Sequence, residues 1–108
     1  MFKFAETLKN MFALKSKLDE LQKALQNRKV EVEVGGGMVR VVMDAQQNVL
    51  DIDFDGELLK DKKMLRDLLL SALSEAKRRA QEAASEEMQK VLGDLGRDLG
   101  DVGPLIPS

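Results

Sequence analysis

The chain of 108 residues is long enough for one domain, and its composition, 44% hydrophobic and 33% charged, is that of a globular protein. It contains no cysteine and no histidine, which excludes disulfides, thiolate nucleophiles, the usual general base and the commonest metal ligands. The formal charge of -2 excludes a uniformly basic polyelectrolyte. We therefore expect a binding or structural protein and not an enzyme, with no cofactor, no metal and no small-molecule substrate.

The first segment, from Phe4 to about Arg28, has the hydrophobic spacing of an amphipathic helix. Its apolar residues recur at steps of three and four, without an intervening glycine or proline. They are Phe4, Leu8, Met11, Leu14, Leu18, Leu21 and Leu25. A stripe of this kind needs a partner surface to cover it. No apolar run approaches the length of a membrane span, so we expect no membrane partner.

Between residues 30 and 54 the hydrophobic period changes to two, which is typical of strands. Residues 30–34, 39–43 and 50–54 alternate apolar with mostly charged side chains, and short glycine-rich or polar segments separate them. The short connections predict a three-stranded antiparallel meander. The alternation places five acidic residues together on one face of this sheet. They are Glu31, Glu33, Asp51, Asp53 and Asp55.

The helical period returns after the strands and predicts a long helix from about Lys62 to Leu92. Asp61 is its expected N-cap and Gly93 its expected end. Glycines and prolines further on predict a disordered tail over residues 93–108. The fold class is therefore α+β, with an N-terminal helix, a three-stranded antiparallel meander and a long C-terminal helix in a single domain, 1–92.

This arrangement leaves apolar surface without a cover. The long helix can cover one face of the sheet, but the stripe of the first helix and two sheet edges remain bare. Self-association removes both problems, because exposed apolar stripes mark interfaces. We therefore expect a homodimer whose interface is formed by the stripe of the first helix, at Leu8, Met11, Leu14, Leu18, Leu21 and Leu25.

The charges are strongly partitioned along the chain. Residues 1–29 carry a net charge of +4, residues 30–59 carry -6, and residues 60–92 carry +2. A polyanion would be repelled from the sheet, so the helices must meet any nucleic acid. The expected DNA contacts are the exposed cations of both helices, Lys9, Lys15, Lys17, Lys23, Lys77, Arg78 and Arg79.

Acidic neighbours distinguish the cations of the long helix from one another. Glu75 lies four residues before Arg79, in the favoured orientation for an ion pair within a helix. Lys77 and Arg78 have no acidic residue four positions before them. We therefore expect these two side chains to be the freer ones for contact with phosphate.

Two other motifs resemble ligand-binding loops but do not support a calcium or a phosphate site. The run from Asp51 to Gly56 matches the start of a calcium loop, but Lys62 stands where the loop needs a bidentate glutamate, and the run lies in a strand. The glycines at 35–37 are followed by a strand, whereas a phosphate loop leads into a helix. We interpret the glycine run as a hairpin connection.

A set of short motifs resembles the YbaB/EbfC family of small bacterial nucleoid-associated DNA-binding proteins. The motifs are Gly37-Met38-Val39-Arg40-Val41, Ile52-Asp53-Phe54-Asp55 with Leu58-Leu59, Met64-Leu65-Arg66-Asp67-Leu68, then Ala72, Ala76, Arg78-Arg79 and Glu86-Glu87-Met88. The resemblance covers about residues 4–92. It implies an intertwined homodimer in which helices project like the arms of tweezers from a shared sheet. It also implies DNA binding with little sequence preference, with Arg78 and Arg79 at the family's basic pair.

Several family features are altered in this chain. Asp44-Ala45-Gln46-Gln47 replaces the usual Asn-Gly turn, Asp55-Gly56 replaces Asp-Pro, and Ser74-Glu75-Ala76 replaces Asn-Asp-Ala. The first two changes alter turn geometry. The third removes an asparagine, so no role of that residue carries over to this chain.

The leading hypothesis is a cytoplasmic, nucleoid-associated homodimer that binds double-stranded DNA through electrostatic contacts from its helices. The alternative is a protein-protein interaction module that uses the amphipathic N-terminal helix, where Phe2 and Phe12 lie off the centre of the stripe. A further alternative is a holdase that binds unfolded clients along the helices. Salt-dependent DNA binding discriminates the first hypothesis from the other two.

Overall fold

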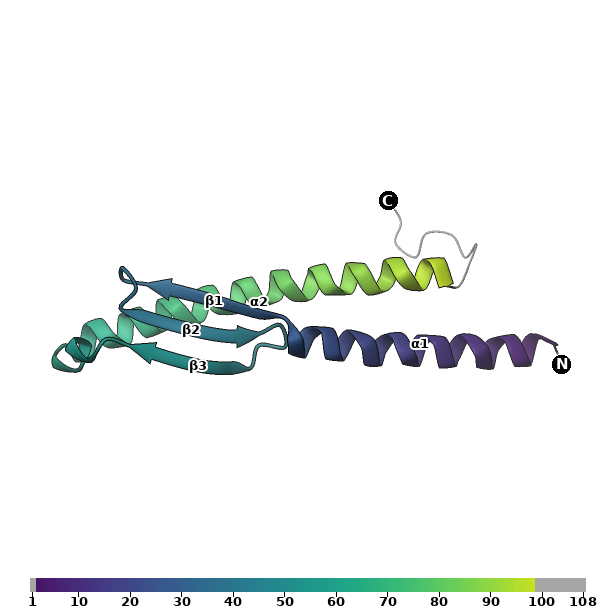
Figure 1. Cartoon of the computed structure of the whole chain (residues 1–108), viewed down its shortest axis with the longest axis horizontal. Coiled ribbons are helices and arrows are strands. Elements are labelled where there is room, and N and C mark those ends of the chain that lie inside the picture. The colour runs from purple at the N-terminus through teal and green to yellow at the C-terminus, as the bar shows by residue number, and fades with distance from the viewer. Residues whose placement is uncertain (1, 99–108) are drawn as a thin grey trace.

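The computed structural model describes residues 2–98, with side chains described for residues 4–93. Its elements, in chain order, are α1 (Phe2–Asn27), β1 (Lys29–Val34), β2 (Val39–Asp44), β3 (Val49–Phe54), the 3-10 helix η1 (Gly56–Lys60) and α2 (Lys62–Asp98). The predicted α+β order of helix, three strands and long helix is confirmed. The molecule is elongated, with extents of 71 × 26 × 16 Å (Figure 1).

The strands form an antiparallel sheet in the order β1-β2-β3, as the short connections predicted. Val32 lies opposite Val41, and Val41 lies opposite Ile52, so these three side chains share one face. The β1–β2 hairpin turns through Gly35, Gly36 and Gly37, which all have positive φ. At Gly35 a side chain would also be crowded, because a Cβ would lie 3.0 Å from a methyl carbon of Leu68, which would have to shift.

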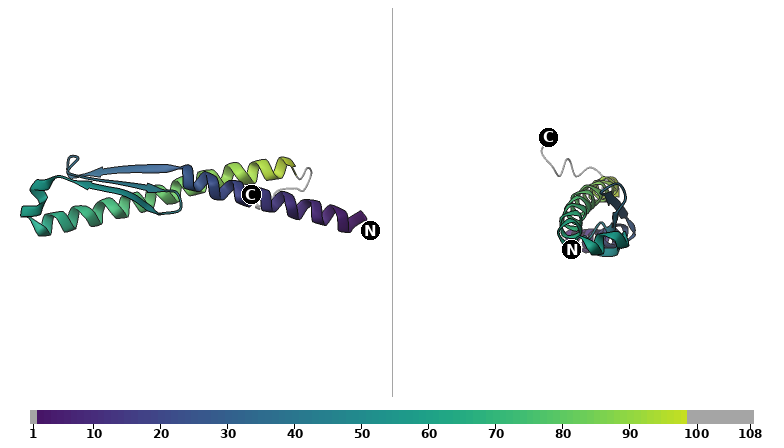
Figure 2. Two further views of the ribbon diagram at one scale, coloured as in Figure 1. Left: turned by 60° about the horizontal axis from the view of Figure 1, so that its bottom comes forward. Right: turned by 90° about the vertical axis from the view of Figure 1, so that its left-hand side faces the viewer.

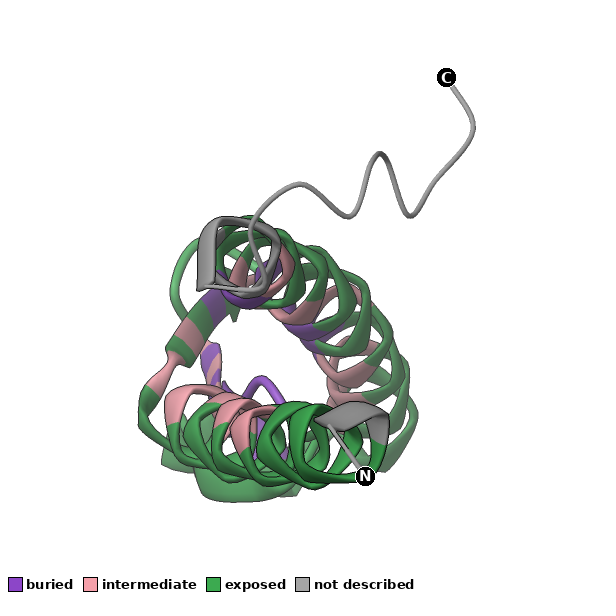
Figure 3. Cartoon of the chain, turned by 90° about the vertical axis from the view of Figure 1, so that its right-hand side faces the viewer, coloured by how far each residue is buried: buried purple, intermediate pink, exposed green. Residues whose placement is uncertain are grey.

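The core lies between the valines of the sheet and one face of α2. Val39 and Val41 are fully buried, and so are three alanines of α2 spaced four residues apart, Ala72, Ala76 and Ala80. A spacing of four keeps small side chains on one face of a helix, which lets the helix axis approach the sheet closely. α2 packs in this way on β1 and β2. Seen end-on, the buried residues face inward between the helices and the sheet (Figure 3).

α1 runs beside the second half of α2, and both helices extend past the end of the sheet (Figures 1 and 2). We call α1 together with residues 80–98 of α2 the arm, and the sheet with η1 and the first half of α2 the base. The end of α1 is fixed to the base by Ala45, whose backbone N–H donates to the carbonyls of Leu25 and Arg28 at 3.1 and 2.9 Å.

The predicted start of α2 is confirmed, and its predicted end is wrong. The carboxylate of Asp61 accepts a hydrogen bond from the backbone N–H of Met64 at 3.1 Å, as an N-cap does. The helix then continues through Gly93 to Asp98. A glycine inside a helix costs only about 1 kcal/mol, so Gly93 and Gly96 weaken this stretch without ending it, and Leu92, Leu95 and Arg97 between and beside them are good helix formers. Residues 99–108, the rest of the expected tail, lie outside the described residues.

Asp44 is a buried carboxylate that organises the β2–β3 turn. It is only 4% exposed, and it accepts hydrogen bonds from the backbone N–H groups of Gln46 and Asn48 and from the side-chain amide of Asn48, at 2.9 to 3.0 Å. Burial alone raises the pKa of this carboxyl. The hydrogen bonds from Asn48 and Gln46 outweigh that effect, so the pKa of Asp44 lies below its ordinary value.

We expect Asp44→Ala to lower the free energy of unfolding by about 1–3 kcal/mol, because two backbone donors lose their acceptor. In the unchanged protein, the contribution of Asp44 is present above the ordinary aspartate pKa and is lost as the pH falls through the lowered folded-state value. Urea unfolding at neutral and acidic pH measures both effects. Asp51→Ala on the exposed outer face is the control, and a destabilisation as large as that of Asp44→Ala would contradict this role for Asp44.

Candidate nucleic-acid interface

Three of the predicted lysines of α1 are available to a polyanion. Lys9, Lys15 and Lys23 are exposed, and none has an ion-pair partner among residues 4–93. At a rise of about 1.5 Å per residue, the span from Lys9 to Lys23 is about 21 Å along the helix. At about 100° per residue, the three side chains spread over roughly 120° of the helix circumference, so they form a broad band and not a single line. We call this band of exposed lysines the lysine row.

Lys17, the fourth predicted lysine of α1, is placed differently. Its side chain is only 20% exposed, and its ammonium lies 3.2 Å from a carboxylate oxygen of Glu20. It shares the half-buried side of α1 with Ala13, Leu21 and Ala24. This lysine is consequently less accessible than Lys9, Lys15 and Lys23.

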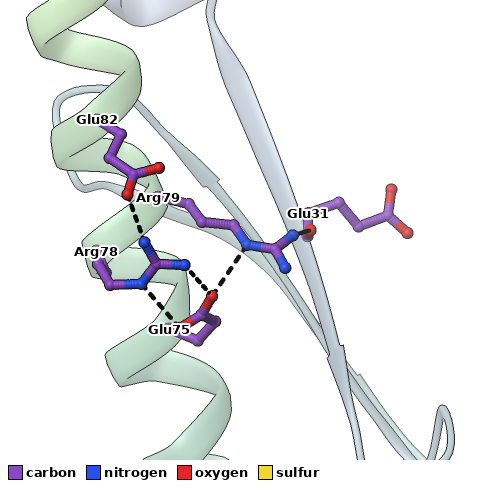
Figure 4. A network of polar contacts seen from close by, with 5 residues as sticks. All are labelled: Glu31, Glu75, Arg78, Arg79 and Glu82. Carbon is purple, nitrogen blue, oxygen red and sulfur yellow. Dashed lines mark hydrogen bonds and ion pairs between the residues drawn. The ribbon is translucent and has the colours of Figure 1, made fainter.

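The two arginines at the centre of α2 belong to a network of carboxylates (Figure 4). Arg78 donates to Glu75 from Nε and Nη2 and to Glu82 from Nη1. Arg79 donates to Glu75 at 3.2 Å and to the backbone carbonyl of Glu31 at 3.1 Å. The expectation that Arg78 is free of an acidic partner is wrong, because carboxylates three residues before and four residues after it also reach its guanidinium.

The network keeps its charges paired over a wide pH range. Hydrogen bonds from Arg78 and then Arg79 outweigh the effect of burial and lower the pKa of Glu75 to about 2. The hydrogen bonds that Arg78 donates to Glu75 also raise the pKa of Arg78 above its ordinary value. Glu75 and Glu82 therefore balance the charges of Arg78 and Arg79. Lys77, which precedes both arginines in the sequence, is exposed and has no ion-pair partner among the residues with described side chains.

The outer face of the sheet is acidic, as the alternation predicted. Glu31, Glu33, Asp51 and Asp53 are all exposed on it. The fifth predicted member, Asp55, follows the end of β3 and instead caps η1, where its carboxylate accepts from the backbone N–H of Glu57. Arg40 lies among them and forms ion pairs with Glu31 and Asp51, so the face is less acidic than its carboxylates alone would make it. The hydrogen bond from Arg40 and its charge lower the pKa of Glu31. The period-two pattern already places Arg40 on this face.

Arg28 holds the arm together, and no local pattern in the sequence predicts its role. Its guanidinium donates to Glu87 at 2.9 Å and to Glu86 at 2.7 Å, which are 59 and 58 residues away. The hydrogen bonds that Arg28 donates to the carboxylates of Glu86 and Glu87 raise its pKa. The clamp fixes the end of α1 against the second half of α2, and so it sets the direction in which the lysine row projects.

The structure separates the residues that were expected to form a dimer interface into two groups. Leu8, Met11, Leu14 and Leu18 are 38–60% exposed along α1. Leu21 and Leu25, nearer the base, are half-buried within the chain itself. Four of the six side chains are therefore exposed and accessible to a partner.

The side chains show no grouping of histidine, cysteine or acidic residues suited to a metal ion within the described part of the chain. No described helix is both long and apolar enough to cross a membrane. An acidic sheet face joined to a projecting helix with unpaired lysines defines a class of α+β protein whose helices, and not the outer face of its sheet, are suited to meet a polyanion.

Comparison with known proteins agrees with this class. The family model for the YbaB/EbfC DNA-binding family matches residues 1–95. A nucleoid-associated protein of Bradyrhizobium diazoefficiens is 40% identical over 95% of this chain and 99% of its own length. One from a Sulfurihydrogenibium species is 37% identical over 86% of this chain and 89% of its own length. The chain belongs to the YbaB/EbfC DNA-binding family.

A solved structure confirms the fold independently. An uncharacterized protein from Helicobacter pylori superposes with a TM-score of 0.75, at 24% sequence identity, over 83% of this chain and 97% of its own. The arrangement of helix, meander and long helix is therefore shared even where the sequences have diverged.

The paired state of the α2 arginines leads to a testable gain of affinity. We expect Glu75→Gln with Glu82→Gln to release Arg78 and Arg79, to tighten binding to duplex DNA at low salt and to steepen its salt dependence. Fluorescence anisotropy at several salt concentrations measures both changes. Glu33→Gln with Glu57→Gln removes the same charge from the base. An equal gain in that control would show that net charge alone is responsible.

Proposed function

We propose that the chain binds double-stranded DNA with little sequence preference, through the lysine row of α1. The observation that carries this proposal is the contrast between the lysines of α1 and the arginine pair of α2, beside which Lys77 is a further exposed cation without a described ion-pair partner. The α1 lysines at positions 9, 15 and 23 have no ion-pair partner among the described side chains, whereas Arg78 and Arg79 of α2 are neutralised. Membership of a DNA-binding family and the names of the relatives support DNA as the partner.

The mechanism is electrostatic. Lysines contact backbone phosphates as point charges and release the counterions condensed there, which supplies affinity without reading the bases. A row of about 21 Å follows roughly six base pairs at 3.4 Å per step. The acidic outer face of the sheet repels the duplex, so the base stays away from the DNA while the arm lies along it.

The active species is a homodimer associated with the nucleoid. A second copy supplies a second arm, and two arms hold a duplex more tightly than one, because the second contact forms at high local concentration. The proposal includes no catalytic step, because the chain has neither histidine nor cysteine and the family is a DNA-binding one. Nucleoid association rests on the names of the relatives from Bradyrhizobium and Sulfurihydrogenibium.

One observation supports the alternative of a protein-interaction module. Phe4, Met11 and Phe12 on α1 are 60–71% exposed, which is unusual for large apolar side chains. They would dock an apolar partner surface along the arm. This candidate predicts that a partner is lost, and DNA binding is kept, when Phe4 and Phe12 are replaced by serine.

We expect Lys9→Gln, Lys15→Gln and Lys23→Gln together to weaken binding to random-sequence duplex DNA at least about tenfold at low salt. The slope of log affinity against log salt should become shallower by about one for each phosphate that the variant no longer neutralises. Anisotropy titrations between low and moderate salt measure both quantities, and a native mass determination checks that the dimer persists.

A matched control is available at the base. Lys60→Gln, Lys62→Gln and Lys63→Gln remove the same charge far from the arm (Figure 1), and we expect them to leave the affinity nearly unchanged. Affinity of the unchanged protein that does not depend on salt would refute the electrostatic mechanism. Equally weakened binding in the control would refute the assignment to α1.

A further inference from the structure

Arg28 is the whole connection between α1 and the sheet. α1 ends at Asn27 and β1 begins at Lys29, so this one residue joins a helix of 26 residues to the base. Its backbone carbonyl accepts a hydrogen bond from the backbone N–H of Ala45 at 2.9 Å, which ties the joint to the β2–β3 turn. A change in the backbone angles of Arg28 would therefore swing the entire helix.

The length of α1 makes a small rotation at this joint large at the lysine row. At a rise of about 1.5 Å per residue, Lys9 lies about 28 Å from Arg28 along the helix. A rotation of about 10° at the joint would move Lys9 by about 5 Å, which is more than the rise of one base pair, about 3.4 Å. The position of the lysines on a duplex therefore depends on how firmly the joint is held.

Packing against α2 holds α1 only near the joint. From Phe4 to Phe12 every side chain of α1 is exposed. The half-buried side chains of the helix are Ala13, Lys17, Leu21, Ala24 and Leu25. Since no described side chain of α1 is fully buried, apolar burial contributes little to fixing the direction of the helix.

The side chain of Arg28 supplies the constraint that packing does not. Its guanidinium pairs with Glu86 at 2.7 Å and with Glu87 at 2.9 Å, both on α2. The side chain of Glu87 is only 15% exposed and also lies 3.6 Å from the ammonium of Lys90, so it is itself held on the helix. A planar guanidinium holds two carboxylates in a fixed geometry, which a single ammonium does not. The clamp therefore restrains the joint at which the backbone of Arg28 would turn.

We propose that Arg28 is a positioning residue for DNA binding, which acts by clamping α1 to α2 and not by contacting the duplex. This inference rests on the proposed function of the lysine row. With the clamp closed, Lys9, Lys15 and Lys23 are presented in one direction. With the clamp released, they keep their charge but sample many directions, and ordering α1 on DNA then costs free energy.

The clamp and simple electrostatics predict opposite effects of removing Glu86 and Glu87. Loss of both carboxylates makes the net charge of the arm more positive by two. Charge alone therefore predicts tighter binding to a polyanion. Loss of the clamp predicts weaker binding in spite of the added positive charge, so the sign of the change in affinity discriminates between the two.

Spin-label distances test the clamp in the absence of DNA. The chain has no cysteine, so Asn10→Cys on α1 and Gln89→Cys on α2, both at exposed positions, give one labelled pair. Dilution with unlabelled chains restricts the measured distance to a single chain. We expect Glu86→Ala with Glu87→Ala, and separately Arg28→Gln, to broaden the distance distribution at least about twofold. A distribution as narrow as that of the unchanged protein would overturn the clamp.

Anisotropy titrations with random-sequence duplex DNA test the positioning role itself. We expect Glu86→Ala with Glu87→Ala to weaken binding at least about threefold at low salt. The matched control, Glu6→Ala with Asp19→Ala, removes the same charge from exposed positions of α1 and leaves the clamp intact, so it should tighten binding. Circular dichroism checks that both variants stay folded. Unchanged or tighter binding by the Glu86→Ala, Glu87→Ala variant would overturn the positioning role.

These experiments separate the inference from the proposed function. Broadened distances and weakened binding on loss of the clamp, together with dependence on Lys9, Lys15 and Lys23, support both proposals. Neutralised lysines that leave DNA binding unchanged overturn the proposed function and the positioning role with it. Binding that depends on the lysines but is not weakened by loss of the clamp overturns only the role of Arg28.

Discussion

The packing of the α2 alanines on the valines of β1 and β2 is the interaction on which the rest of the structure depends. Ala72, Ala76 and Ala80 are fully buried beside Val39 and Val41. Small side chains bring the helix close to the sheet, but they also reduce the width of sheet surface that the helix covers. A helix seated so closely covers two strands well and leaves the third exposed. The apolar face of β3 is thus a consequence of the same alanines that form the core.

The cations of α1 and the arginines of α2 differ in their ion pairs because the two helices pack differently in the fold. α2 is the element around which the chain folds, and its arginines tie carboxylates on their own helix and a carbonyl of β1 in place. α1 touches the rest of the chain along one alanine-rich side only, so most of its lysines have no structural task. A cation engaged in a surface ion pair must lose that partner to bind a phosphate, whereas a solvated lysine loses only water and counterions.

Periodicity predicted the elements, because hydrophobic spacing reports directly on which face is buried. The helix at Phe4, the three strands and the cap at Asp61 all follow from local pattern. The predicted end of α2 lies too early, since Gly93 and Gly96 each cost only about 1 kcal/mol and do not end the helix, which continues to Asp98. The site was harder to predict. The hydrogen bond between Arg28 and Glu87 joins residues almost sixty positions apart, which local patterns do not reveal. The ion pairs of Arg78 involve carboxylates both before and after it along the helix.

The direction of the arm relative to the base is fixed by contacts at the end of α1. The end of α1 is held at one point by the two hydrogen bonds from Ala45 and at another by the ion pairs of Arg28 with Glu86 and Glu87. Two fixed points on a helix determine its axis, so the lysine row projects at an angle set by the β2–β3 turn and by α2.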